Sequence, residues 1–224
     1  MKIAIIGTGN VGSALTTALT RAGHDVTVAA RDADRAAAVA SELGAAAGPS
    51  PAEAASAADI VVLAVPFGAL GDVARSIAGQ TAGKIVIDVS NPLKPDFSGL
   101  ATDGGPSAAE QVAEALPDAH VAKAFNTVFA SLQANPTAHG VVLDALYATD
   151  DERAGETVAE VIRSIGFRPV NAGPLRSARQ MEALAWLNMS LQMRTNGDWR
   201  SAFVLVGAPP AVTEQLVAAG SARA

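Results

Sequence analysis

The clearest signal in this chain lies near its start, at Lys2-Ile3-Ala4-Ile5-Ile6-Gly7-Thr8-Gly9-Asn10-Val11-Gly12. A short apolar run, typical of a buried parallel strand, leads into G-x-G-x-x-G, and apolar residues then recur at helical spacing. In such a motif Gly7 permits a tight turn, Gly9 lets the backbone approach a pyrophosphate, and Gly12 lets the helix pack close to the strand. The start of the helix would present free N–H groups to the phosphates. The segment therefore predicts a dinucleotide site.

Apolar strands and amphipathic helices alternate along most of the chain. We expect strands over 2–6, 26–30, 60–65, 84–89, 121–125, 141–149 and 168–170. We expect helices over 11–21, 32–43, 67–78, 107–116, 152–165 and 175–194, with a further short helix that begins at 49–51. This alternation predicts an α/β, Rossmann-type fold with a doubly wound parallel sheet and a small C-terminal helical extension. The end of the chain is expected to be weakly ordered, except for a short helix after Pro210.

Composition excludes several classes of function. The 224 residues include 16 Lys and Arg against 22 Asp and Glu, a net charge of −6, and 50% are hydrophobic, which rules out wholesale disorder. An acidic chain without a basic run is a poor nucleic-acid binder. The lack of Cys excludes disulfides, thiolate catalysis and Cys-based metal sites. No signal-peptide core and no apolar run of about 18–20 residues is present, so we expect a soluble, cytoplasmic protein without a membrane partner.

Positive charge gathers in one part of this acidic chain. Residues 163–200 contain six basic side chains against two acidic ones, a net charge of +4. The basic side chains are Arg163, Arg168, Arg176, Arg179, Arg194 and Arg200. They are either ordinary solvated helix faces or a local surface that attracts a negatively charged small ligand.

The end of the second strand favours NADP over NAD. An NAD site places Asp or Glu there to bind the ribose hydroxyls, whereas this chain has Ala30 followed by Arg31, with Arg35 one helical turn later. Two guanidinium groups on one face suit a 2′-phosphate, and Thr8 can add a hydroxyl donor. Asp32 could instead bind an NAD ribose, but its position favours a helix cap.

Groups that usually donate a proton in hydride transfer are poorly placed. His24 lies in a turn, His120 begins a strand and His139 lies in a loop, so structural roles are favoured for all three. Tyr147 lies within a strand, and the direction of Lys123, the one lysine near the crevice, is left open. We therefore assign no catalytic side chain and no metal ligand. A reductase of this kind would need an acceptor that takes a hydride without an enzymatic acid, as flavin-like rings can.

Several short segments accompany the glycine motif: Ala30-Arg31, Val62-Leu63-Ala64-Val65-Pro66, Ser90-Asn91-Pro92-Leu93 and Ala172-Gly173-Pro174-Leu175, followed by Arg179 and Glu182. With these segments, the chain resembles the coenzyme F420-dependent NADP oxidoreductase family over about residues 1–207. The segment Lys123-Ala124-Phe125-Asn126-Thr127 is more similar to the reductase domains of STEAP-type metalloreductases, which pass hydride from NADPH to a flavin. Some F420 reductases carry His at the position of Asn126. The two resemblances therefore imply different hydride acceptors, F420 in one case and a flavin in the other.

The resemblance implies two groups of binding residues. The cofactor NADP(H) would contact Gly7, Thr8, Gly9, Asn10, Val11, Gly12, Arg31, Arg35, Ala64, Val65, Pro66, Asn91, Ala124 and Asn126. The acceptor ring would lie against Pro92, Leu93, Asn126, Thr127, Leu187 and Met193. For Leu187 and Met193, plain helix packing in the core is favoured over a contact with the acceptor. The implied organisation is an NADP-binding Rossmann domain at 1–150 and a small α/β and helical region at 151–224 that closes the acceptor cleft.

Three functions are consistent with these features. The first is hydride transfer between NADPH and the deazaflavin coenzyme F420, whose anionic tail suits the basic segment. The second is the same chemistry on FMN, FAD, ferric ion or a quinone. The third is a non-catalytic NADP sensor that binds a partner protein. The family resemblance also implies a homodimer. A β-hydroxyacid dehydrogenase is disfavoured because the region after Leu175 is too short for the helical domain of those enzymes.

Overall fold

One eight-stranded sheet organises the molecule. The computed structural model describes residues 1–138 and 140–207. The strand order is β10-β9-β6-β5-β4-β1-β2-β3, and all neighbours pair in parallel except β6 and β9. The strands are β1 (Lys2–Ile6), β2 (Asp25–Ala29), β3 (Ala46–Ala47), β4 (Ile60–Leu63), β5 (Ile85–Asp88), β6 (His120–Ala124), β9 (Asp144–Thr149) and β10 (Arg168–Asn171).

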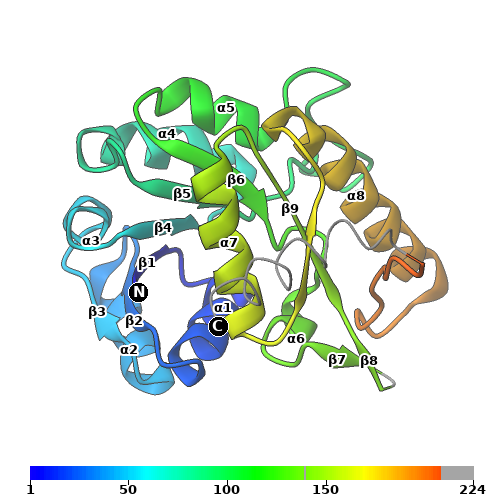
Figure 1. The fold of residues 1–224 in the computed structure, drawn as a ribbon, viewed down its shortest axis with the longest axis horizontal. Coiled ribbons are helices and arrows are strands. Elements are labelled where there is room, and N and C mark those ends of the chain that lie inside the picture. Colours follow the sequence, from blue (N-terminus) through cyan, green and yellow to red (C-terminus); the bar gives the residue numbers. More distant parts are fainter. Residues whose placement is uncertain (139, 208–224) are drawn as a thin grey trace, which may run out of the picture.

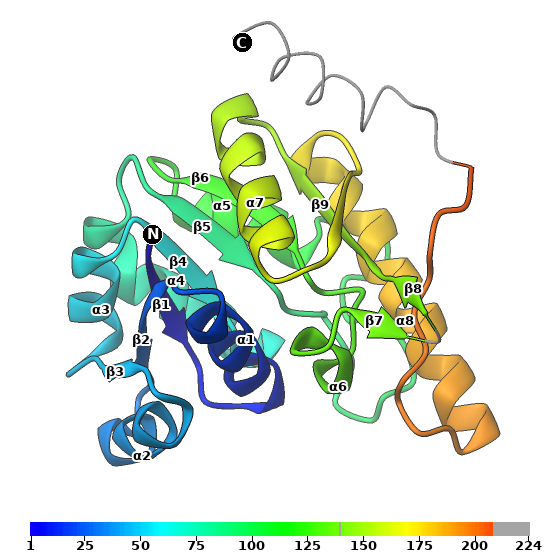
Figure 2. The same cartoon turned by 60° about the horizontal axis from the view of Figure 1, so that its bottom comes forward.

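Helices cover both faces of this sheet, as Figures 1 and 2 show. They are α1 (Asn10–Arg21), α2 (Ala33–Leu43), α3 (Pro51–Ala57), α4 (Phe67–Ile77), α5 (Ala108–Ala115), α6 (Ala130–Gln133), α7 (Glu152–Ser164) and α8 (Ala178–Thr195), with 3-10 turns at Ala78–Gln80 and Leu175–Ser177. Ile3 and Ile5 of β1 join the core formed with α1 and α7, whereas Ala4 and Ile6 join the core formed with α3, α4 and α5. This alternation confirms the predicted doubly wound α/β fold.

Two features of the C-terminal half differ from the prediction. The strand expected over 141–149 is wrong as a single element: Val141–Val142 forms β8, which pairs with β7 (Thr137–Ala138) in a separate hairpin, and only Asp144–Thr149 enters the main sheet as β9. β9 runs antiparallel to β6. Hydrophobic patterning reports burial but not strand direction, so this reversal carried no sequence signal.

The sheet crosses the predicted domain boundary. β9 ends at Thr149, α7 begins at Glu152, and β10 then returns beside β9. Because strands before and after residue 150 belong to one sheet, the strand pairing marks no domain boundary there. The division at residue 150 stays a prediction. The helix expected after Pro210, like His139, lies outside the described residues. In the part of the chain that the structure covers, no helix combines the length and apolar character needed to cross a bilayer.

Candidate functional site

The glycine loop, residues 7–12, lies between the carboxyl end of β1 and the start of α1. Gly7 has φ +133°, and a Cβ built there would lie 2.1 Å from the carbonyl oxygen of Ala64. A Cβ on Gly12 would lie 2.3 Å from the carbonyl oxygen of Gly7. A Cβ on Gly9, in contrast, would meet no atom within 4 Å. Two of the glycines are thus required by packing, and the third borders open space at the start of a helix.

The amino terminus of α1 is suited to an anion. Its N-cap is Gly9, no side chain caps it, and its first turn contains no acidic residue. The N–H groups of the first turn are therefore available to a ligand, and the helix dipole favours a negative charge there.

A cavity of about 600 Å³ opens beside the glycine loop. Its lining includes the predicted residues Gly7, Thr8, Gly9, Arg31, Arg35, Ala64, Val65 and Pro66. Pro51, Ala69 and Val73 also line it and were not predicted, because nothing in their apolar patterns separates them from core positions. Asn10 and Val11 lie in the first turn of α1. The ends of β1, β2 and β4, which are neighbours in the sheet, therefore surround one space of a size suited to a small-molecule ligand.

The arginine pair, Arg31 and Arg35, lies on the β2 side of this cavity. Both side chains are exposed, and within residues 1–138 and 140–207 neither forms an ion pair. Asp32 accepts a hydrogen bond from the backbone N–H of Arg35 at 3.0 Å and caps α2, which confirms its predicted role as a cap. The carboxylate is therefore engaged with the helix, and both guanidinium groups face solvent at the mouth of the cavity.

The asparagine pair, Asn91 and Asn126, joins the segments that follow β5 and β6. Asn126 Nδ2 donates to Asn91 Oδ1 at 2.9 Å, and Asn91 Nδ2 donates to the Asn126 carbonyl oxygen at 3.0 Å. Three buried polar atoms nearby in sequence have no hydrogen-bond partner among the described residues: Ser90 Oγ, Asn126 Oδ1 and Thr127 Oγ1. Buried polar groups are rarely left unpaired, so these three atoms are candidates for pairing with a ligand that reaches them, although each is buried in this structure.

The turn that carries Asn126 is held in an uncommon conformation. Phe125 has φ 62°, in the left-handed region that a bulky L-residue seldom occupies, at a cost of about 1–3 kcal/mol. Gln133, which is fully buried, donates from Nε2 to the carbonyl oxygens of Phe125 at 2.9 Å and Val128 at 3.0 Å. Gln133 thus supports the turn, a role for which the sequence carried no signal.

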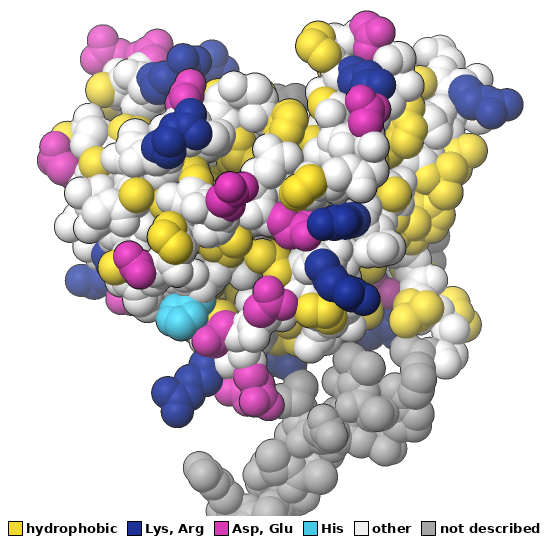
Figure 3. Space-filling view, turned by 90° about the horizontal axis from the view of Figure 1, so that it is seen from above, with side chains coloured by type: hydrophobic (Ala, Val, Ile, Leu, Met, Phe, Trp, Pro, Cys, Tyr) yellow, Lys and Arg dark blue, Asp and Glu magenta, His cyan; other side chains and the backbone are white. Residues whose placement is uncertain are grey.

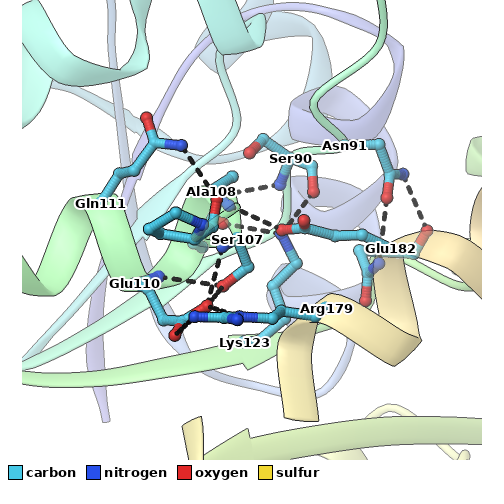
Figure 4. Close-up of polar contacts among 12 residues, drawn as sticks. Ser90, Asn91, Ser107, Ala108, Glu110, Gln111, Lys123, Arg179 and Glu182 are labelled. Carbon is cyan, nitrogen blue, oxygen red and sulfur yellow. Dashed lines mark hydrogen bonds and ion pairs between the residues drawn. The ribbon is translucent and has the colours of Figure 1, made fainter. Parts of the chain in front are cut away.

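A charge cluster formed by Asp88, Lys123 and Glu182 adjoins the asparagine pair through Ser90. Figure 4 shows Lys123 and Glu182 of this cluster beside Ser90 and Asn91. Lys123 is fully buried, and its Nζ donates to Asp88 Oδ2 at 2.7 Å, to the Ser90 carbonyl oxygen at 2.6 Å and to Glu182 Oε1 at 2.8 Å. Burial raises the pKa of the Glu182 carboxyl, and the Lys123 ammonium opposes that rise. Lys123 therefore points into the protein and is engaged by three acceptors.

The predicted acceptor-ring residues occupy two different places. Pro92, Leu93, Asn126 and Thr127 follow β5 and β6, whereas Leu187 and Met193 lie on α8. Packing into the core, which the sequence favoured for these last two, is wrong, because Leu187 is 48% and Met193 is 41% exposed. None of the six lines the cavity at the glycine loop, nor a second cavity of about 720 Å³ between the β7–β8 hairpin and residues 198–206.

Other polar residues singled out from the sequence lie elsewhere. His24 Nε2 bonds Ser164 Oγ at 2.7 Å, and His120 Nδ1 lies 3.0 Å from Asp151 Oδ2 at the start of β6. Tyr147 is buried in β9 against Gly155 of α7. In the basic segment 163–200, Arg168 pairs with Asp144 and Arg179 with Glu110, so two of its six arginines are engaged by carboxylates.

The chain is similar to known proteins along nearly its whole length. Residues 2–92 match the family described as "NADP oxidoreductase coenzyme F420-dependent". The F420-dependent NADP reductase of Methanothermobacter thermautotrophicus is 35% identical over 212 residues, which cover 87% of this chain and 90% of the relative. Metalloreductase STEAP3 of Rattus norvegicus is 35% identical over 184 residues, but the match covers only 36% of that protein's length. A crystal structure of a candidate F420-dependent NADP-reductase from Arthrobacter sp. FB24 superposes with a TM-score of 0.82 at 28% identity, over 92% of this chain and 99% of that one.

Proposed function

Because the chain belongs to the F420-dependent NADP reductase family, an NADP-dependent oxidoreductase family, we propose that it transfers hydride between NADPH and coenzyme F420. The observation that carries the proposal is the arginine pair at the mouth of the glycine-loop cavity, in the position where an NAD enzyme would have an acidic residue. The 35% identity to the Methanothermobacter reductase supports F420 as the acceptor.

The glycine-loop cavity suits the adenine and phosphate half of NADPH. The free N–H groups at the start of α1 would bind the pyrophosphate, and open space at Gly9 leaves room for it. The arginine pair would bind the 2′-phosphate, with Thr8 as a further donor. Ala64, Val65 and Pro66, which follow β4, would direct the cofactor towards the neighbouring strand β5.

The asparagine pair and its surroundings suit the nicotinamide ring. When bound, NADPH supplies a hydride, and a proton from solvent completes reduction of the acceptor. Ser90 Oγ, Asn126 Oδ1 and Thr127 Oγ1 have no partner among the described residues and would pair with a carboxamide that entered here, whereas Ala124 is fully buried in the core. The acceptor ring would lie between Pro92, Leu93 and Thr127 on one side and Leu187 and Met193 of α8 on the other.

The titratable groups beside the asparagine pair support catalysis by positioning. These groups are the members of the charge cluster, and Lys123 is bonded to both carboxylates. None of them is free to protonate a substrate oxygen, which favours an acceptor ring that takes a hydride without an enzymatic acid.

A flavin, ferric ion or quinone is the second candidate acceptor. The STEAP3 match and the metalloreductase-like segment 123–127 favour it, although the chain spans only about a third of that relative. The test measures oxidation of NADPH by the purified protein with F420, FMN, FAD, a ferric chelate and a quinone offered separately. Reduction of F420 alone supports the proposal. Reduction of flavin, ferric ion or quinone but not F420 supports the second candidate, and NADPH binding without turnover supports a sensor.

We also propose that the protein is a homodimer joined through α8. Leu187, Leu191 and Met193 are 48%, 44% and 41% exposed, and Leu187 and Leu191 share one helix face. Leu187 and Met193, which are also proposed to contact the acceptor ring, would then place the acceptor beside the interface. Figure 3 shows hydrophobic side chains gathered on the flank of the molecule to which α8 belongs. An apolar helix face of this kind is typical of an interface between two copies.

A further inference from the structure

We propose that Glu182 is a positioning residue that acts through Lys123 to fix the asparagine pair. Its effect on catalysis rests on the proposed function, in which the asparagine pair holds the nicotinamide ring. Glu182 itself lies on α8, more than fifty residues along the chain from Asn126, and is 1% exposed.

A closed path of short contacts links the charge cluster to the asparagine pair. Lys123 Nζ donates to the carbonyl oxygen of Ser90 at 2.6 Å, and Asn91 is the next residue. Asn91 bonds in both directions to Asn126, and Asn126 lies three residues after Lys123 on the same strand end. Lys123 therefore holds the segment after β5 against β6. A shift of its ammonium group is expected to move one asparagine relative to the other.

Glu182 completes the coordination of that ammonium group. A lysine ammonium has three N–H donors, and Asp88, Ser90 and Glu182 supply one acceptor each. Glu182 Oε1 also accepts from the backbone N–H of Ala108 at 2.9 Å, at the start of α5. Without the Glu182 carboxylate, Lys123 would keep Asp88 and Ser90 but lose the acceptor that draws it towards α8.

Stability alone is a poor explanation for this arrangement. Buried ion clusters contribute little net stability, since desolvation offsets their attraction, whereas they impose a defined geometry. A second ion pair, Glu110 with Arg179, already ties α5 to α8, with Arg179 Nη2 2.7 Å and Nε 2.8 Å from the two carboxylate oxygens. That pair is partly exposed, and Glu110 bonds to Ser107 at the start of α5 but, among the described residues, to neither Ser90 nor Asn91. It therefore provides a matched control.

The test compares Glu182→Gln with Arg179→Gln. For each variant, NADPH affinity and the single-turnover rate of hydride transfer from NADPH to F420 are measured. Glu182→Gln is expected to slow transfer about 10-fold to 100-fold, as a small displacement of reacting groups does, while NADPH affinity stays within about twofold. Arg179→Gln is expected to leave both quantities within about twofold, as for a partly exposed ion pair. Equal slowing in the two variants would overturn the proposal.

A triple variant separates positioning from stability. Asp88→Asn, Lys123→Met and Glu182→Leu together remove every charge of the cluster, a change that often preserves or raises stability. If the folded triple variant transfers hydride at the wild-type rate, the positioning role is wrong. Slow transfer by a stable triple variant supports it.

A further readout distinguishes failure of this inference from failure of the proposed function. In the protein without cofactor, hydrogen exchange of isotope-labelled asparagine side-chain amides reports the Asn91–Asn126 bonds. Faster exchange in Glu182→Gln, but not in Arg179→Gln, supports the link through Lys123 even if the wild-type protein reduces no F420. Unchanged exchange in Glu182→Gln overturns it whatever the acceptor is.

Discussion

A Cβ atom on Gly7 would lie 2.1 Å from the carbonyl oxygen of Ala64, so the glycine loop and the end of β4 are in direct backbone contact. No side chain larger than hydrogen fits between them without a backbone shift. The contact fixes the loop relative to the adjacent strand before any ligand binds. Packing therefore requires glycine at positions 7 and 12, whereas Gly9 borders open space.

Replacing Gly9 with Ala tests the phosphate-binding role. The new methyl group meets no protein atom within 4 Å, so the protein is expected to fold, with a loss of about 1 kcal/mol because Ala is a poorer N-cap than Gly. NADPH affinity, measured by calorimetry, is expected to fall about 10-fold or more because the methyl group occupies the space of the pyrophosphate. Gly79→Ala is the control, since it also meets no atom within 4 Å. Unchanged NADPH affinity in Gly9→Ala would contradict the assignment.

Replacing both Arg31 and Arg35 with Ala tests the choice of cofactor. Each guanidinium that binds the 2′-phosphate contributes about 1.5–3 kcal/mol, so loss of both is expected to lower NADPH affinity about 100-fold or more. NADH, which lacks that phosphate, is expected to bind almost as before. Affinities for both nucleotides are compared with those of Arg21→Ala, an exposed arginine at the far end of α1. An equal loss of affinity for NADPH and NADH would show that the arginine pair does not bind the 2′-phosphate.

Replacing Asn126 with Leu tests the ring site. The change removes both the bond from Nδ2 to Asn91 and the unpartnered Oδ1, and it places a branched apolar side chain beside the proposed ring position. Acceptor reduction is expected to fall about 100-fold, because misplaced rings lose the benefit of orientation. NADPH binding through the glycine loop is expected to persist. Asn135→Leu, at an exposed position, is the control, and normal turnover by Asn126→Leu would show that the acceptor lies elsewhere.

Glu110 gives the stability a defined pH dependence. The hydrogen bond from Arg179 lowers the pKa of Glu110 to about 2, from an ordinary value of 4.5. A pKa that is lower in the folded state stabilises the protein above pH 4.5, and this contribution is lost as the pH falls towards 2. The free energy of unfolding, measured with urea between pH 4.5 and pH 2, is expected to fall less steeply with decreasing pH in Arg179→Gln than in Arg194→Gln. The same slope in both variants would rule out the linkage.

Replacing Leu187 and Leu191 with Glu tests the proposed dimer. Two carboxylates on the exposed face of α8 would repel their copies across a twofold interface, so light scattering is expected to report a dimer for the wild type and a monomer for the double variant. Phe97→Ser, at another exposed apolar residue, is expected to remain dimeric. A wild-type protein that is monomeric at micromolar concentrations, or a double variant that stays dimeric, would contradict the proposal.

Most of the fold followed from local patterns. Short segments determine the glycine loop, the apolar strands and the end of α2 at Gly44, which has φ 70°. The geometry of such segments depends little on distant residues. The break at Leu143 and the reversal of β9 depend on pairing between distant strands, which an apolar pattern does not encode. Long-range pairing was therefore the part of the fold that could not be predicted.

The site divides in the same way. Arg31 and Arg35 could be assigned because their positions relative to β2 follow from the motif. The roles of Lys123 and Gln133 could not, since each depends on contacts made after folding: Lys123 bonds to Glu182, and Gln133 bonds to the carbonyl oxygen of Phe125. The positive φ of Phe125 was equally hidden, because nothing in its neighbours along the chain demands it.

The order of strands in the sheet also sets an order of assembly. All six strands of the parallel part, β1 to β6, precede residue 125, and they form one uninterrupted run from β3 to β6. Ribosomes make the chain from its amino terminus, so these six strands are synthesised before β9 and β10. β9 and β10 are thus added to a single free edge of a sheet whose other strands have already been synthesised. Lys123 follows Asp88 by 35 residues and precedes Glu182 by 59. The ribosome therefore completes the nucleotide-facing half well before α8 exists.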